Sequence, residues 1–397
     1  MKATQFYLCI LLLLNLWSLH ASPSQLIGYE TATIVEQGPH HRVIQRLAQY
    51  RTSYGKVIKK PSQYVELATG MHYWEDDQWK LSSNEIEIFE GTALTRKGPH
   101  KVIFAANLNS VGAIDLSAPD GQRFRSHILG LAYTDAASGQ SVMIATVKDC
   151  IGAVLPPNQV YYLDAFEGDC QADVRYTYEI GSFEQDVIIT QAPPSPAEWG
   201  LDPATTRLEA WTEFIEAPEP TVNSAVLKAT ADPLLRQAMF EPDLIDERLR
   251  FGSMSIASGR AFPLEQDDPF GDQSVPTGKS WESVEQRLFL IEKVDYQDVL
   301  AHLNTLPQTV AAPRNKLAPA GAPIQRMARV FPPVPKGTPG KWVPNQYAKL
   351  DPHRKGLVLD YVTLNSSQTN NVFSAEITYF ITDQERRTPE LGPGAKL

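Results

Sequence analysis

The chain has 397 residues and a formal net charge of −10, from 36 Lys and Arg against 46 Asp and Glu. This mildly acidic balance argues against nucleic acid and anionic membrane surfaces as partners, because both attract basic proteins. Hydrophobic residues make up 43% of the chain, which is enough for ordinary cores, and the length suggests two or three domains.

The first residues have the pattern of a secretory signal peptide, which we place at residues 1–21. Lys2 supplies a positive start, an apolar run covers Phe6–Trp17, and Ala21 is a small residue suited to cleavage before Ser22. The apolar run is too short to span a bilayer, and a buried N-terminal helix is the alternative. No later stretch is apolar enough for a membrane span. We therefore expect a protein that is secreted or held at the cell surface, with no integral membrane segment after signal removal.

Cysteine usage agrees with export. Cys9 lies in the predicted signal peptide, so the mature chain keeps Cys150 and Cys170. An even pair in an exported protein predicts one disulfide. The alternatives are a two-thiolate half-site for a metal or two buried free thiols. No His or Cys cluster at metal-ligand spacing accompanies the pair, which favours the disulfide.

The predicted elements begin after a lead-in of residues 22–60. His72–Trp74 and Trp79–Leu81 are short aromatic runs on either side of the polar Glu75–Gln78, a pattern that predicts a β-hairpin. Runs typical of strands follow, separated by turn residues such as Pro119-Asp120-Gly121. They lie at residues 85–89, 101–105, 113–116, 123–133, 141–147, 159–165, 173–180 and 183–190. No helical pattern separates them, so we expect an antiparallel β-sandwich over residues 61–192.

Residues 193–306 are predicted to be a second β-rich domain or a continuation of the first. The prolines at 193, 194 and 196 mark the boundary. Strand-like runs occur at 207–215, 225–228, 248–251 and 287–294. A helix is predicted over Tyr296–Leu306, with Asp295 as its N-cap and Pro307 ending it.

Residues 307–344 contain nine prolines and six Lys or Arg, but no Asp or Glu. This composition predicts an extended linker. The β-prone runs 356–363 and 372–381 then predict a C-terminal hairpin module within residues 345–385, followed by a disordered tail of residues 386–397. An isolated hairpin is marginally stable in water, so this one either docks onto the rest or begins a further module.

Several stretches resemble a known group of bacterial proteins. Residues 172–190 read ADVRYTYEIGSFEQDVIIT, and residues 356–382 read GLVLDYVTLNSSQTNNVFSAEITYFIT. Together with ELATGMHYWEDDQWK and EPDLIDERLRFG, they are similar to the N-terminal region of large, uncharacterised secreted or wall-associated proteins of the RHS (YD)-repeat type. The RHS repeats themselves are absent here. The resemblance implies an extracellular module and carries no functional residue with it.

Candidate catalytic and metal-binding residues are weak in this sequence. His40, His41 and His100 follow Gly-Pro pairs, but no close pair of histidines with zinc-ligand spacing exists. Glu75-Asp76-Asp77 and Asp267-Asp268 could bind calcium or serve as an acid/base pair, yet their turn-like surroundings favour solvated turn residues. The sequence contains no GxSxG motif, no phosphate-binding glycine loop and no Cys/His nucleophile pair. We therefore expect neither a catalytic residue, a metal nor a cofactor.

Tyr73, Trp74 and Trp79 are the best candidates for binding a ligand, because aromatic rings on one face of a hairpin can stack on sugars. Cross-strand aromatic pairs also stabilise hairpins for purely structural reasons, and we favour that interpretation.

The sequence as a whole predicts an all-β, mainly antiparallel protein. It comprises a β-sandwich-like module, a β-rich continuation, a Pro-rich linker and a C-terminal hairpin. The expected role is that of a secreted, non-enzymatic structural or adhesive extracellular module. The alternative is a secreted protein that binds or processes carbohydrate. The expected partners are an extracellular polysaccharide or another cell-surface protein.

Overall fold

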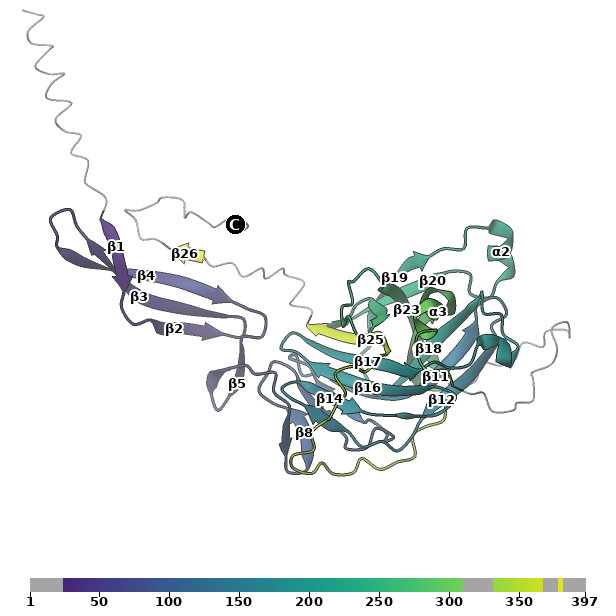
Figure 1. Ribbon diagram of the computed structural model, residues 1–397. Coiled ribbons are helices and arrows are strands. Elements are labelled where there is room, and N and C mark those ends of the chain that lie inside the picture. Colours follow the sequence, from purple (N-terminus) through teal and green to yellow (C-terminus); the bar gives the residue numbers. More distant parts are fainter. Residues whose placement is uncertain (1–23, 310–330, 367–377, 381–397) are drawn as a thin grey trace, which may run out of the picture. The chain divides into compact units, whose positions relative to one another are not determined.

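The computed structural model describes residues 24–309, 331–366 and 378–380. The described chain is mostly β-structure, and nearly all of its strand pairs are antiparallel (Figure 1), so the predicted fold class is confirmed. The chain divides into two compact units. The small unit contains residues up to Ala68 together with 378–380, and the large unit contains the described residues from Thr69 to Ser366. The predicted signal peptide, its cleavage site at Ala21–Ser22 and the predicted tail of residues 386–397 lie outside the described residues.

The small unit is one sheet of five strands. They are β1 (Gln25–Tyr29), β2 (Thr33–Gly38), β3 (His41–Arg51), β4 (Val57–Leu67) and β26 (Thr378–Phe380). β3 pairs with β4 over its whole length, while β1 and β2 pair one after the other along the opposite edge of β3. Much of what the sequence predicts as a lead-in thus folds as strands. The alternation of polar and apolar residues is weak in this stretch, because most side chains of the sheet remain partly exposed.

The large unit begins with the hairpin of β5 (His72–Glu75) and β6 (Gln78–Leu81), as the sequence predicts. Asp76 and Asp77 both have positive φ, +52° and +58°, which is the geometry of a tight two-residue hairpin turn. Asp tolerates this left-handed region better than most residues do. The following strands of the first half are β7 (Glu87–Phe89), β8 (Thr92–Thr95), β9 (Lys101–Phe104), β10 (Ile114–Ser117), β11 (Arg123–Asp135), β12 (Ser141–Val147), β13 (Ala153–Leu155), β14 (Gln159–Tyr162), β15 (Phe166–Gly168), β16 (Gln171–Tyr178) and β17 (Ser182–Gln191).

The second half of the large unit continues the same sheet system. After the short 3₁₀ helix η1 (Pro196–Trp199), its elements are β18 (Thr206–Glu216), β19 (Thr221–Lys228), α2 (Pro233–Ala238), β20 (Leu244–Phe251), β21 (Met254–Ile256), β22 (Gly259–Pro263), β23 (Val275–Val284), β24 (Arg287–Asp295), α3 (Tyr296–Leu303) and β25 (Leu357–Ser366). β18 pairs with β11 on one side and with β24 on the other. Residues 193–306 are therefore a continuation of the first β-structure, and both halves share one core.

Two rows of strands face each other across that core. One row runs β12–β11–β18–β24–β23, and the other runs β16–β17–β25–β22. A hydrogen bond of 3.0 Å from Gln185 Nε2 to Thr212 Oγ1 joins β17 to β18 inside the molecule. Tyr176 and Phe183 stack beside it with ring centroids 5.7 Å apart. This arrangement is sandwich-like, with polar groups satisfied within an apolar interior.

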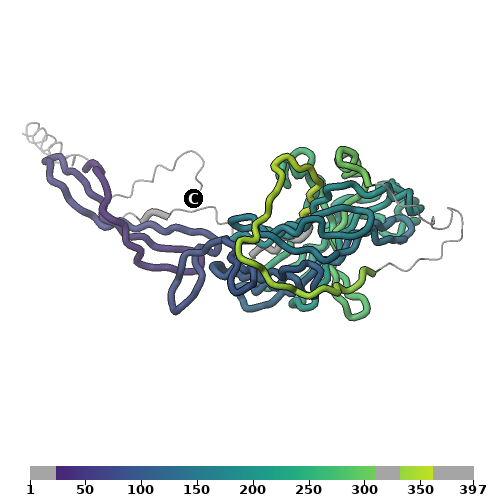
Figure 2. Tube along the Cα trace, turned by 60° about the horizontal axis from the view of Figure 1, so that its bottom comes forward, coloured from purple at the N-terminus to yellow at the C-terminus, as the bar shows by residue number. Residues whose placement is uncertain are grey.

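The segment from residue 331 to β25 differs most from its prediction. Figure 2 shows it, in yellow-green, crossing the surface of the large unit. Trp342 is 3% exposed, and its Nε1 donates a 2.8 Å hydrogen bond to the carbonyl of Phe104. The part of the predicted linker 307–344 that the structure describes is therefore docked onto the large unit. Residues 310–330 lie outside the described residues.

The predicted C-terminal hairpin of residues 345–385 is also replaced by another arrangement. β25 pairs with β17, β21 and β22 in the large unit, whereas β26 pairs with β4 in the small unit. The predicted boundary at residue 60 falls inside β4, and the two units divide at Ala68 instead. Local sequence patterns identify strands but carry no information on which distant strand will be the partner.

Candidate functional site

The predicted sugar-stacking aromatics do not form a flat platform. Tyr73 is 7% exposed, whereas Trp74 is 54% exposed. The rings of Trp74 and Trp79 lie 4.9 Å apart, but their planes meet at 71°, so the edge of one ring faces the other. Stacking on a sugar requires open, parallel ring faces, whereas this edge-to-face contact is a usual way to stabilise a hairpin.

The predicted Cys150–Cys170 disulfide is not formed. Both cysteines are buried free thiols. Cys150 Sγ donates to the carbonyl of Leu163 at 3.0 Å, and Cys170 Sγ lies 3.9 Å from the carbonyl of Gln191. Burial raises the pKa of Cys150 to about 11 and raises that of Cys170 further. Both thiols thus behave as small core residues, the alternative that the even cysteine count could not distinguish from a disulfide.

The histidines and acidic turns singled out in the sequence remain separate. His41 Nε2 lies 3.3 Å from Glu36 Oε1, and His100 is buried against Tyr178 with ring centroids 4.6 Å apart. Burial lowers the pKa of His100 to about 4, which keeps this imidazole neutral.

Each acidic turn is held by its own contacts. Lys80 Nζ lies 2.9 Å from Glu75 Oε2 and 2.6 Å from Asp76 Oδ2. Asp267 accepts a 3.0 Å bond from Arg175, and Asp268 accepts one from the backbone of Phe270. Within the described residues, no group of three or more His, Cys, Asp or Glu is arranged to hold a metal ion.

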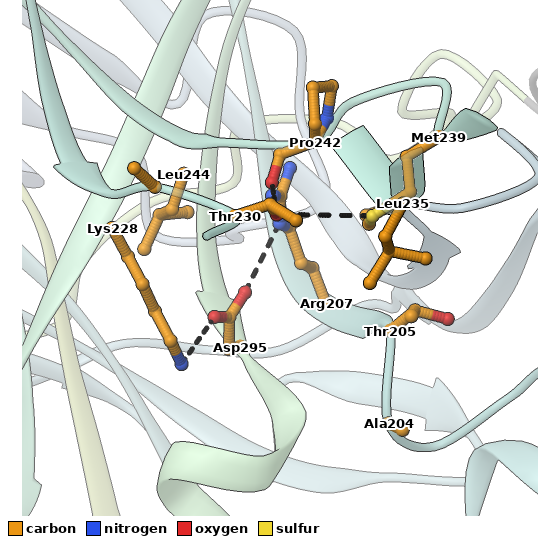
Figure 3. Close-up of a pocket in the computed structure, with 12 residues that line it drawn as sticks. Ala204, Thr205, Arg207, Lys228, Thr230, Leu235, Met239, Pro242, Leu244 and Asp295 are labelled. Carbon is orange, nitrogen blue, oxygen red and sulfur yellow. Dashed lines mark hydrogen bonds and ion pairs between the residues drawn. The ribbon is translucent and has the colours of Figure 1, made fainter. Parts of the chain in front are cut away.

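A pocket of about 210 Å³ lies between the ends of β18, β19 and β24 and the helix α2 (Figure 3). Arg207, at the start of β18, is 4% exposed and reaches Asp295 at 3.2 Å and Glu241 at 3.0 Å. Lys228, at the end of β19, lies 2.8 Å from the other oxygen of Asp295. Figure 3 shows the side chains of Lys228 and Arg207 both reaching Asp295. The apolar wall is formed by Leu235, Met239 and Leu244.

Local structure explains why these charges meet. Asp295 ends β24 and begins α3, where a negative side chain interacts favourably with the helix N-terminus. Asp232 caps α2 by accepting bonds from Leu234 and Leu235, which turns that helix over the pocket. The chain thus places cations and carboxylates at neighbouring element ends.

The charged side chains of this pocket form ion pairs with one another and with nearby carboxylates. Burial alone would lower the pKa of Lys228, but hydrogen bonds to Asp295 and Asp298 outweigh it and raise the pKa. Every charged side chain that lines the pocket pairs with an opposite charge. These ion pairs hold the ends of β18, β19 and β24 together. None of the paired groups is a nucleophile with an adjacent base.

The small unit carries a second concave surface, of about 720 Å³, where β1 and β2 leave the middle of β3 uncovered. Tyr29, Glu30, Thr31, Thr33, Gln45, Arg46 and Leu47 line it. The Arg46 guanidinium lies 3.5 Å from the ring centroid of Tyr29 and 4.8 Å from that of Tyr64. Guanidinium–aromatic contacts of this kind are common where proteins bind partners.

Large apolar side chains are exposed on the strands of the small unit and in the turn between β3 and β4. Leu26, Ile27, Tyr29, Ile34, Val35, Leu47, Tyr54 and Val57 are each at least 37% exposed. The sequence analysis missed these residues, because the signal is only a run of β-prone residues without a buried face. The period-two spacing of Ile44, Arg46 and Ala48 on β3 is the one regular pattern in that stretch.

In comparisons with known proteins, no family model, no curated protein and no solved structure matches the chain. Among the described residues, no helix is both long and apolar enough to cross a membrane.

Proposed function

We propose that the chain is an exported, non-enzymatic module that adheres to another extracellular protein through the sheet of the small unit. The observation that carries this proposal is the set of exposed apolar side chains around Arg46 on a one-layer sheet. Within the described residues of the small unit, no helix or second sheet covers this surface. A partner that covered it would remove apolar area from water and so gain hydrophobic free energy.

The N-terminal sequence supports the extracellular location. Lys2, the apolar run Phe6–Trp17 and the small residue Ala21 occur in the order that a Sec-type signal requires. An exported module with an exposed binding sheet suits a role at the cell surface.

The large unit supports a structural role over a catalytic one. Its charged pocket residues bind one another across element ends, as Arg207 does with Glu241 and Asp295. Catalysis requires a group that is free to accept or donate a proton to substrate, and a paired, buried guanidinium cannot do so. The large unit is thus best explained as a structural part of the module.

The test is an adhesion assay with the full mature chain on beads. The beads are applied to two surfaces. The first is coated with extracellular protein of the producing organism, and the second with its purified wall polysaccharide. We expect retention on the protein surface only. The double variant Ile34→Thr/Val35→Thr keeps β-branched side chains on β2 but removes apolar area, so we expect it to weaken retention by about tenfold or more.

Two further variants make the assay decisive. Phe270→Ser changes an 86% exposed aromatic residue of the large unit, and retention should be unchanged. Trp74→Ala should also retain binding. Retention on the polysaccharide surface that Trp74→Ala abolishes would instead establish the carbohydrate-binding alternative and contradict the proposal.

A further inference from the structure

Three buried ionisable residues of the large unit have no part in the proposed binding surface. Lys279 on β23 is 1% exposed, Asp246 on β20 is 0% exposed, and Glu292 on β24 is 1% exposed. Charged residues are rarely buried to this degree, because removal from water costs several kcal/mol for each ion.

The strand pairing brings the three together. β20 and β23 meet in parallel at a single pair of residues, Asp246 and Lys279. On the other side of β23, Lys279 lies directly opposite Glu292 in the antiparallel register with β24. Directly opposed side chains on paired strands are within contact distance. Lys279 therefore pairs with Asp246 on one neighbouring strand and stands opposite Glu292 on the other.

A glycine makes the approach of β20 to β23 possible. A Cβ on Gly278, next to Lys279, would lie 2.4 Å from the carbonyl oxygen of Ile245, next to Asp246. Any larger residue would push the two strands apart. The close approach lets Lys279 Nζ contact Asp246 Oδ1 directly.

The contacts of Asp246 fix its carboxyl group in one orientation. Ser258 Oγ donates a 2.5 Å bond to Oδ2, and Arg248 Nε lies 3.5 Å from the same oxygen. The other oxygen and the carboxyl carbon therefore face the amine.

Glu292 has an oxygen without a partner. Its Oε2 is buried and makes no hydrogen bond. Burial raises the pKa of Glu292 well above its ordinary value; Lys279 opposes this rise, while Asp360 and Asp246 add to it. This rise favours the protonated form of Glu292, a carboxylic acid that can donate a proton inside the protein.

We propose that Lys279 and Asp246 condense into an intramolecular amide, and that Glu292 is the acid–base group of this reaction. A side-chain amide would join β20 to β23 covalently, thirty-three positions apart in the chain. No external reagent is required.

The reaction balances as follows. Transfer of one proton within the Lys279–Asp246 pair gives a neutral amine and a neutral carboxylic acid. The amine nitrogen Nζ attacks Cγ of Asp246, forming a C–N bond. Glu292 donates its proton to the departing hydroxyl group of Asp246, so that one C–O bond breaks and water leaves. The Glu292 carboxylate then takes the proton that Nζ loses and is regenerated.

The fold supplies what this condensation needs. The two reacting groups are held together by folding, which gives an intramolecular reaction a high effective concentration. The buried surroundings favour replacement of an ion pair by an uncharged amide, because the amide carries no desolvation cost for charge. A covalent cross-link between strands also suits a module that must hold its shape outside the cell.

The experiment is a mass measurement on the folded full chain. Its mass should be lower by one water molecule than the sequence requires. A tryptic digest should contain residues 237–248 linked to residues 261–287, because trypsin cannot cleave after an amidated Lys279. Recovery of these peptides unlinked from folded protein would overturn the proposal.

Three variants test the roles of the groups. Lys279→Arg keeps the charge but lacks the amine, so its mass should equal the sequence mass. Glu292→Gln keeps the shape of the side chain but cannot relay the proton. The mass of this variant should therefore also equal the sequence mass. Lys293→Arg is the matched control: Lys293 is 5% exposed and pairs with Glu241 at 3.2 Å, and this variant should still lose one water. Full water loss in Glu292→Gln would overturn the role of Glu292. If either test variant fails to fold, the wild-type digest alone decides.

Discussion

Glu184 lies on β17 in surroundings that do not favour its charge. Burial, the largest cause, raises its pKa to about 7, and the nearby Asp186 adds to the effect. Arg175 opposes the rise only in part, because it already binds Asp186 at 2.7 Å and Asp267 at 3.0 Å. This carboxyl group therefore changes charge near neutral pH and not in the acid range usual for Glu.

The change of charge predicts a pH-dependent stability. The ordinary pKa of Glu is 4.5, and the folded value lies above it. Between pH 4.5 and about 7 the folded state holds a proton that the unfolded state has released, so stability falls as pH rises through this range. Glu184→Gln removes the titration. At pH 8 we expect it to raise the free energy of unfolding by up to about 3 kcal/mol.

Urea unfolding of both proteins at pH 4 and pH 8 measures this effect. The two should be nearly equally stable at pH 4, where Glu184 is mostly protonated in both states. The exposed Glu167→Gln serves as the control and should change neither value. Equal stability of Glu184→Gln and wild type at pH 8 would show that Glu184 titrates normally.

At the scale of single elements, the sequence predicts strands well where one strand carries a long local pattern. β11, β12, β17, β18 and β24 lie within a few residues of their predicted positions. Short strands such as β13, β15 and β21 have too few residues to show alternation, and their pairing partners supply what the local pattern lacks.

The candidate sites were less predictable than the strands. Lys279 and Asp246 meet only because two strands pair in parallel at one position. The sequence shows each of them merely as a charged residue with polar neighbours in a β-prone run. Arg46 and Tyr29 likewise come together through the register of β1 against β3. Such meetings depend on non-local pairing, which local patterns do not encode.

Composition was misleading for the segment around Trp342. Prolines remove backbone donors but keep their carbonyl acceptors, and the carbonyl of Pro339 accepts a 2.9 Å bond from Asn107. The backbone of Trp342 also donates to the carbonyl of Gly91 at 2.9 Å. A Pro-rich segment can thus lie extended against other parts of the fold and form backbone hydrogen bonds with them.

Removal of the buried indole tests that docking. Trp342→Ala should lower the free energy of unfolding by about 3 to 5 kcal/mol, the usual range for a buried Trp in a core. It would leave a cavity beside Gly152, which packs so closely that a Cβ atom added to it would lie 2.7 Å from the Trp342 ring. Trp74→Ala, at a 54% exposed position, should cost far less in the same chemical denaturation experiment. Similar small losses in both variants would mean that the segment behaves as a free linker.

At the scale of the whole molecule, the large unit is completed by a strand from far along the sequence. β25 pairs with β17, β21 and β22, so it joins strands from both halves of the unit. Leu357, Val358 and Leu359 of this strand are at most 2% exposed and complete two of the buried clusters. Folding of the large unit therefore cannot finish before residues 357–366 have been added.

Two truncations test this dependence. A chain ending at residue 306 lacks the docked segment around Trp342 as well as β25. It exposes the edges of β17, β21 and β22, together with the apolar side chains that β25 covers. Unpaired edges and exposed apolar surface favour aggregation, so we expect this chain to aggregate or to lose its cooperative thermal transition. A chain ending at Ser366 keeps β25 and, of the elements that the structure describes, lacks β26 alone, which pairs with β4 in the small unit. It should keep the main transition at nearly the wild-type temperature, measured by calorimetry. If the chain ending at residue 306 melts cooperatively at the same temperature as the chain ending at Ser366, β25 is an accessory strand and the large unit is complete without it.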